Sequence, residues 1–115
     1  MDLTDKKCVP CEGGVPKFSP EEVAEHMKQL PEGWEVKEGV KIHKRFVFEN
    51  FILAMKFVNQ MAELAEAEGH HPDFTVVYNK VDVTLWTHAI GGLFLNDFIV
   101  AAKLEQLPSI KKTNK

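Results

Sequence analysis

The spacing of the apolar residues changes its period four times along this chain of 115 residues. A period near 3.6 indicates an amphipathic helix, and a period of two indicates a half-buried strand. Helical spacing covers residues 20–30, 51–67 and the segment that follows Gly91-Gly92 as far as Pro108, whereas strand spacing covers 34–48 and 74–88. Because the connections are short, the strands must pair as antiparallel hairpins. The predicted fold class is therefore α+β: a two-layer sandwich in the order α-β-β-α-β-β-α, with a four-stranded antiparallel sheet covered on one face by helices.

The length and composition are those of one soluble globular domain. Hydrophobic residues make up 44% and charged residues 27% of the chain, as in ordinary globular proteins. The net charge of -3 without a basic stripe argues against direct nucleic-acid binding. No apolar run approaches the roughly 20 residues of a membrane span, and the first residues lack the apolar region of a signal peptide. We expect a cytoplasmic protein with no membrane contact.

The ends of the chain differ from its middle. Residues 1–18 are rich in Gly and Pro and predict an extended arm, residues 19–108 form the domain, and residues 109–115 predict a polar, frayed tail. The arm carries Cys8 and Cys11, which should be reduced in a cytosolic protein. Their spacing also fits half of a zinc site, completed by a second arm across a dimer, or a redox couple. We favour two incidental thiols.

Local signals fix several boundaries. Ser19, with Pro20 and Glu22 behind it, predicts a capping box at the start of the first helix. Asn50 predicts the cap of the second helix. The dipeptide Asn79-Lys80 predicts a two-residue hairpin turn.

The second predicted helix is apolar over an arc of about 200°, wider than one sheet face can bury. The first and third helices cover the excess, or a second subunit does. A row at one edge of this arc is the candidate contact with another subunit: Leu53, Phe57, Met61 and Leu64. Because such a row would be unusual on a soluble monomer, we expect a homodimer or a homotetramer built from dimers.

Three imidazoles lie between the carboxylates of Glu66 and Asp97, within 32 residues of the chain. Histidine exchanges protons near neutrality, so two imidazoles around one pocket suit a reaction that needs an acid and a base at the same pH. Proline at position 72 biases His71 away from the helical region. The pair His70-His71 should therefore lie where a helix ends and a strand begins. His88 falls on the polar side of the last predicted strand, facing solvent or a ligand.

The intervals between these residues resemble the signature of the pterin-4a-carbinolamine dehydratases. The resemblance covers Phe18 to Leu107, and the segments 78–81 and 84–88 strengthen it. Trp34 falls where the family carries a tryptophan near its substrate pocket. The signature positions are Glu66, His70-His71-Pro72, Tyr78, His88 and Asp97.

The resemblance implies dehydration of a 4a-hydroxytetrahydropterin to the quinonoid dihydropterin, the step of tetrahydrobiopterin recycling that follows aromatic amino-acid hydroxylation. The nitrogen lone pair assists loss of the hydroxyl, so neither a metal nor an organic cofactor is expected. By carry-over, His70 and His88 form the acid/base pair, and Glu66 orients or polarises an imidazole. The implied substrate-binding residues are His71, Pro72, Trp34, Tyr78 and Asp97. Asp97 is the one that also supports the site or binds a histidine.

Two other classes of function fit some of the same residues. His70, His71, His88 and Glu66 are all zinc-ligand types, although adjacent histidines tend to diverge. A non-catalytic binding module is the second alternative, because the family includes members that stabilise dimers of a homeodomain transcription factor.

Overall fold

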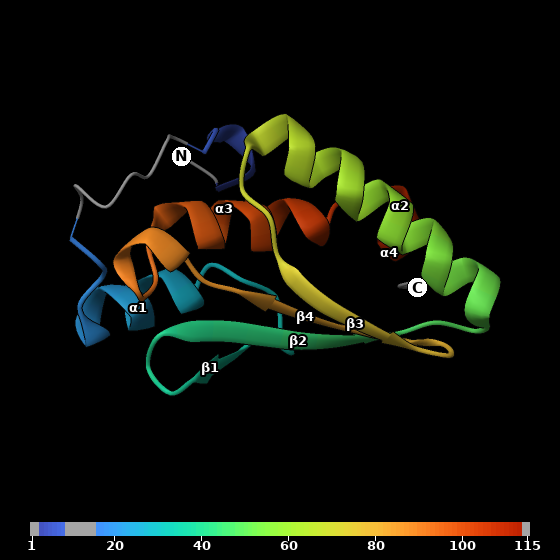
Figure 1. Ribbon diagram of the computed structural model, residues 1–115, viewed down its shortest axis with the longest axis horizontal. Helices are drawn as coiled ribbons and strands as arrows, with labels where there is room; N and C mark the ends of the chain where they lie inside the picture. The colour runs from blue at the N-terminus through green and yellow to red at the C-terminus, as the bar shows by residue number, and fades with distance from the viewer. Residues whose placement is uncertain (1–2, 9–15, 114–115) are drawn as a thin grey trace.

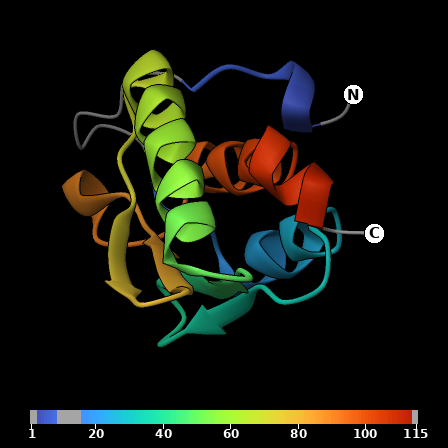
Figure 2. The same ribbon diagram turned by 90° about the vertical axis from the view of Figure 1, so that its right-hand side faces the viewer.

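The computed structural model describes residues 3–8 and 16–113 of the chain, and it has two layers. One layer is the sheet, and the helices α2 (Phe51–Glu68) and α3 (Leu95–Leu104) lie across one of its faces (Figure 1). The view turned by 90° shows α2, α3 and α4 (Pro108–Thr113) on the same side of the sheet (Figure 2). No helix within residues 3–8 and 16–113 has both the length and the hydropathy needed for a membrane span.

The sheet has four antiparallel strands in the spatial order β1-β2-β4-β3. The strands are β1 (Glu35–Lys37), β2 (Lys41–Val47), β3 (Asp73–Val77) and β4 (Lys80–Leu85). The predicted fold class is confirmed, including the order of helices and strands. β3 lies at one edge of the sheet, which places the junction between α2 and β3 beside the end of β4.

The main helices are α1 (Pro20–Met27), α2 (Phe51–Glu68) and α3 (Leu95–Leu104), with 3-10 turns η1 (Leu3–Asp5) and η2 (His88–Ile90). The predicted capping box is present: Ser19 Oγ accepts from the Glu22 N–H, and Glu22 accepts from the Ser19 N–H. Asn50 caps α2 by accepting from the Leu53 N–H at 2.9 Å. Each cap satisfies donors that the first turn leaves without partners.

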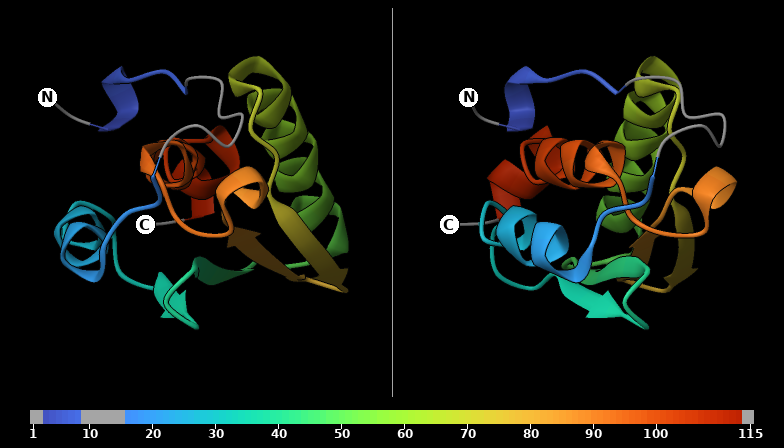
Figure 3. Two further views of the ribbon diagram at one scale, coloured as in Figure 1. Left: turned by 60° about the vertical axis from the view of Figure 1, so that its left-hand side comes forward. Right: turned by 90° about the vertical axis from the view of Figure 1, so that its left-hand side faces the viewer.

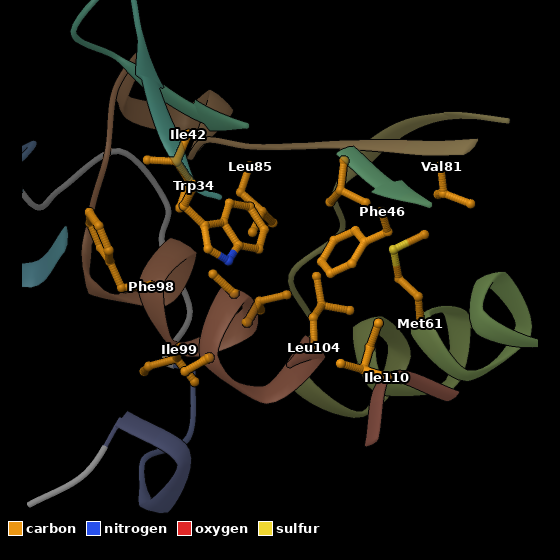
Figure 4. Close-up of a cluster of buried hydrophobic side chains, with 14 of the residues drawn as sticks. Trp34, Ile42, Phe46, Met61, Val81, Leu85, Phe98, Ile99, Leu104 and Ile110 are labelled. Carbon is orange, nitrogen blue, oxygen red and sulfur yellow. The ribbon is translucent and has the colours of Figure 1, made fainter. Parts of the chain in front are cut away.

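The core lies between the sheet and the helices (Figure 4). β4 alternates as predicted: Val81, Val83 and Leu85 are fully buried against the helices, and the residues between them face the open side. Trp34 lies among these core side chains, and its indole N–H donates to Glu105 Oε2 at 2.9 Å.

The row on α2 predicted as a subunit contact is part of the core, so that prediction is wrong. Phe57 is fully buried, with its ring 4.8 Å from that of Phe46, and Met61 is 1% exposed. Leu53 and Leu64 are partly buried against the same cluster. The wide apolar arc of α2 is covered from inside the chain, because α3 and α4 pack beside it over the sheet.

The C-terminal segment is helical where a frayed tail was predicted. The predicted third helix divides into α3, which ends at Leu104, and α4 (Pro108–Thr113). Proline disfavours the helical region for the residue before it and fits the first turn of a new helix. Ile110 anchors α4 because it is buried in the core, and the Ser109 N–H donates to Gln60 Oε1 at 3.1 Å.

The hairpin turn between β3 and β4 lies one residue earlier than predicted. Val77 pairs with Lys80, so the turn is Tyr78-Asn79. Tyr78 has a φ of 53°, in the left-handed region that non-glycine residues seldom adopt. Asn79 explains the shift, because its side-chain N–H donates to the Phe48 carbonyl at 2.8 Å and its own carbonyl accepts from the Phe48 N–H at 2.9 Å. These two bonds fix Asn79 against the chain that follows β2.

Residues 3–8 are packed onto the domain, in contrast to the extended arm predicted for residues 1–18. Leu3 is 1% exposed, and η1 contacts α3. In both views of Figure 3 the blue segment runs over α3 toward the C-terminal end of α2. The Cys8 N–H donates to Glu68 Oε1 at 2.8 Å. Cys11 lies outside the described residues, so the zinc and redox alternatives for the pair stay predictions.

We expect Cys8 to be unreactive in the folded protein. Burial, and after it the neighbouring Glu68 carboxylate, together raise the pKa of its thiol to about 12. The thiolate is the reactive form, so almost none is present at pH 8. In a Cys11→Ser variant, where Cys8 is the single remaining thiol, iodoacetamide should label the native protein at least about 100-fold more slowly than the urea-unfolded protein. Equal labelling rates would contradict the burial of Cys8.

Candidate active site

A cavity of about 370 Å³ opens where α2 ends, β4 ends and α3 begins. The side chains that matter for its chemistry are His70, His71, Pro72, Trp86, His88 and Asn96. Three of the predicted site residues are histidines, and the structure brings all three to this one cavity. The predicted junction between a helix and a strand is also confirmed, because α2 ends at Glu68 and β3 begins at Asp73.

Gly69 turns the chain from α2 into the cavity. It has a φ of 68°, and its N–H and that of His70 both donate to the Ala65 carbonyl, at 2.9 and 3.2 Å. A glycine in this left-handed conformation is a common end of a helix, because it lacks a Cβ that would clash. Pro72 then keeps the following chain extended. His70 is therefore held directly beyond the last turn of α2.

His70 pairs with a fully buried carboxylate. Its Nε2 lies 2.6 Å from Asp97 Oδ1. Asp97 Oδ2 accepts from the Thr87 hydroxyl at 2.8 Å and from the Phe94 N–H at 3.0 Å, which caps the start of α3. An ionised carboxylate only accepts hydrogen bonds, so Nε2 must be the protonated nitrogen of His70. Nδ1 is left as the ring nitrogen for proton transfer.

His71 diverges from His70 and pairs with a different carboxylate. Its Nε2 lies 2.6 Å from Glu66 Oε2, and both side chains are exposed. Glu66 therefore orients an imidazole, as the resemblance implied, but that imidazole is His71. Glu66 stands at the rim, whereas Asp97 supports the site from beneath.

His88 reaches the cavity from the chain that follows β4. A bridge between Thr87 and Gly92 closes the loop that follows β4, and η2 begins at His88. The His88 ring stacks on Trp86 with centroids 4.0 Å apart, and its Nε2 lies 3.6 Å from Asp73 Oδ2. The Trp86 N–H donates to the same carboxylate oxygen at 3.1 Å. His88 is thus positioned by an aromatic ring and a carboxylate while 59% of its side chain stays exposed.

Two predicted site residues lie elsewhere. Trp34 is buried in the core and does not line the cavity. Tyr78 is exposed in the β3–β4 turn, at the opposite end of these strands from His70 and His88. In this structure of the single chain, neither aromatic side chain is near the histidines.

The sequence pattern did not single out Asp73 and Trp86, which flank His88. The alternation along β4 placed Trp86 on the same face as Thr84, but nothing marked it as functional. Asp73 pairs with Thr84 across the β3–β4 ladder. The pairing of β3 with β4 is the signal that brings Asp73 to the end of β4, beside Trp86 and His88.

The arrangement provides proton transfer at two points of one cavity. Among the described residues, no group of three or more His, Cys, Asp and Glu side chains is placed to hold a metal ion. Each histidine instead faces its own carboxylate. Such histidine–carboxylate pairs fix the ring and favour an imidazolium formed during a reaction.

Comparison with known proteins connects this site to a family. The sequence model described as "Pterin 4 alpha carbinolamine dehydratase" matches residues 16–107. The chain is 50% identical over 106 residues to a protein of Nitrosomonas europaea named "Putative pterin-4-alpha-carbinolamine dehydratase", covering 92% of this chain and 93% of the relative. A protein of the same name from Halorhodospira halophila is 47% identical over 108 residues, with 93% and 98% covered.

Two solved structures share the fold. One, described as a transcriptional coactivator/pterin dehydratase from Brucella melitensis, has a TM-score of 0.74 and 35% identity and covers 78% of this chain and 96% of that chain. The other, described as a pterin dehydratase-like protein and RuBisCO assembly factor in the alpha-carboxysome, has a TM-score of 0.55 and 24% identity, covering 64% and 87%. At that identity the second likeness shows the fold alone.

Proposed function

The chain belongs to the pterin 4 alpha carbinolamine dehydratase family, and we propose on that basis that it dehydrates a 4a-hydroxytetrahydropterin to the quinonoid dihydropterin in tetrahydrobiopterin recycling. The observation that carries the proposal is the pair of histidines that line one cavity, His70 with Asp97 and His88 with Asp73. One proton must reach the leaving hydroxyl and another must leave N5. Two imidazoles in one cavity meet that requirement.

The surroundings of the two histidines differ, and the difference supports a separate role for each. His70 donates Nε2–H to the buried Asp97, so neutral His70 offers Nδ1 as a base for the N5 proton. The imidazolium formed there lies beside the Asp97 carboxylate. His88 is more exposed, and as an imidazolium it protonates the C4a hydroxyl. The C4a–O bond then breaks, the N5 lone pair forms the C4a=N5 double bond, and water leaves.

The test is a dehydratase assay on chemically generated 4a-hydroxytetrahydropterin, followed by the absorbance of the quinonoid product. We expect turnover well above the spontaneous rate, unchanged after dialysis against a strong chelator because proton transfer alone suffices. A rate equal to the spontaneous one would refute the proposal. Loss of activity with removal of stoichiometric zinc would favour the metal site instead.

A non-catalytic binding module is the alternative within the same family. The relative from Brucella melitensis carries both "transcriptional coactivator" and "pterin dehydratase" in its description. Binding alone does not require three histidines each paired with a carboxylate. We therefore favour catalysis, and the assay separates the two.

We also propose that the protein is a homo-oligomer that associates along β3. This strand lies at the sheet edge, so one side of its backbone is open to pairing with another chain. Large apolar side chains are exposed along it and at the nearby start of α2: Phe51, Ile52, Phe74, Val77 and Tyr78. A second copy of the chain would cover both the edge and these side chains.

We expect the double change Ile52→Glu and Val77→Glu to reduce the mass in analytical ultracentrifugation to that of a monomer, because like charges would meet across a two-fold axis. Val36→Glu is the matched control, since Val36 is exposed on β1 at the opposite edge. A wild-type protein that sediments as a monomer at micromolar concentration would contradict the proposal, as would equal effects of the two changes.

A further inference from the structure

Glu68 has no role in the proposed chemistry, yet both of its carboxylate oxygens have partners. Oε1 accepts from the Cys8 N–H at 2.8 Å, and Oε2 accepts from Lys103 Nζ at 2.5 Å. The Glu68 side chain is only 6% exposed. Burial alone would raise its pKa, but the Cys8 N–H and Lys103 outweigh it and hold the pKa of Glu68 below its usual value. Glu68 is thus an ionised carboxylate held from two sides.

The segment Leu3–Cys8, which we name the N-terminal clasp, reaches both helices beside the cavity. Lys7 Nζ donates to the Ala67 carbonyl at the end of α2, at 3.1 Å. The Cys8 thiol donates to the Asn96 carbonyl in the first turn of α3, with 3.6 Å between Sγ and oxygen. Leu3 anchors the other end of the clasp in the core. The matched family span begins at residue 16, so the clasp lies outside it.

The clasp and the His70–Asp97 pair join the same two helix ends. Glu68 is the last residue of α2 and lies two positions before His70, and Asn96 directly precedes Asp97 in α3. Lys103 adds a second link from α3 to Glu68. Loss of these links would remove the hydrogen bonds of Glu68 to Cys8 and to Lys103, two positions away from the His70–Asp97 pair.

From this geometry we propose that Glu68 is a positioning residue: held by Cys8 of the clasp and by Lys103, it fixes the end of α2 so that His70 stays in hydrogen-bond contact with Asp97. The proposal deepens the proposed dehydratase function and rests on it only for the kinetic part of the test. A reaction that depends on the placement of a base is sensitive to displacements of about 1 Å.

The first measurement needs no substrate. In full-length protein labelled with ¹⁵N-histidine, NMR should show a slowly exchanging His70 ring N–H held by Asp97. Glu68→Ala and Lys103→Met should each speed its exchange by about tenfold, with kcat lowered about tenfold and KM changed less than about twofold. Lys103→Arg, which keeps the cation, should restore both.

Lys44→Met is the matched control. Lys44 pairs with Glu105 in a similarly buried ion pair away from the cavity. In Lys44→Met, Glu105 still accepts the hydrogen bond from the Trp34 N–H. In the same way, Glu68 still accepts the hydrogen bond from the Cys8 N–H in Lys103→Met. Equal effects of Lys44→Met and Lys103→Met would overturn the proposal, because the loss would then be general destabilisation. So would unchanged ring exchange in folded Glu68→Ala, or no slowly exchanging ring N–H in the wild type.

If Glu68→Ala does not fold, Lys103→Met decides the question, since it leaves Glu68 and its Cys8 contact in place. Faster exchange of the His70 ring N–H in Lys103→Met, with slow exchange restored in Lys103→Arg, supports the positioning role even if neither the wild type nor any variant turns over the pterin. Absence of turnover in all of these proteins would refute the dehydratase proposal and leave the positioning role standing.

Discussion

Replacing both His70 and His88 by alanine is expected to lower kcat by about 10⁴-fold, and either single change by about 10²-fold. The two rings line one cavity, each beside its own carboxylate. Removal of one leaves water or the other imidazole to transfer its proton. Removal of both takes away the acid and the base together, so the double loss should exceed either single loss.

His43→Ala is the control for this experiment. His43 also pairs with a carboxylate, with its Nε2 3.0 Å from Asp82 Oδ1, but this pair lies on β2 and β4, away from the cavity. It should keep wild-type kcat. Circular dichroism and urea unfolding should show that all the variants fold. A double variant with wild-type turnover would exclude both histidines from the chemistry.

The second large effect is expected in stability. The double change Phe57→Glu and Met61→Glu should unfold the chain, because it places two carboxylates in the fully packed layer between α2 and the sheet. Even Phe57→Ala should cost about 3–5 kcal/mol, out of a free energy of unfolding of about 5–15 kcal/mol for a domain. Phe57 has ring contacts with both Phe46 and Phe48, at 4.8 and 5.2 Å.

Ala62→Glu tests whether this loss is specific to the buried face. Ala62 lies on the same helix, but it is exposed. Urea unfolding followed by circular dichroism should place this variant within about 1 kcal/mol of wild type. A folded Phe57/Met61 double variant of lower oligomeric mass would mean that this row is an interface after all.

The elements of the fold could be predicted because their signals are local. The capping box at Ser19, the cap at Asn50 and the alternation along β4 depend on neighbouring residues only. α4 was missed because its stability depends on tertiary contact: Ile110 packs into the core, and nothing in the polar sequence around it indicates a partner. The hairpin turn was misplaced for the same reason, since Asn79 is held by Phe48 from outside the hairpin.

The three histidines that line the cavity could be predicted from the sequence, but the carboxylate beside each of them could not. The sequence placed His70 and His88 near one another, but it could not say which carboxylate each imidazole meets. The pairing depends on where α3 starts relative to the end of α2. In the structure His70 pairs with Asp97, and His71 pairs with Glu66. The aromatic residues were harder still, because Trp34 and Tyr78 are compatible with a pocket, a core or a surface.

Asp97 accepts hydrogen bonds from a helix start, a loop hydroxyl and a histidine at the same time. Any shift in the register of α3 therefore also moves His70, the proposed base. An insertion between His88 and Phe94 is tolerable only if it bulges outward and leaves Thr87, His88 and Phe94 where they are. A one-residue deletion inside the first turn of α3 would rotate position 97 by about 100° and abolish all three bonds. The loop between His88 and Phe94 should therefore tolerate a change of length that the first turn of α3 does not.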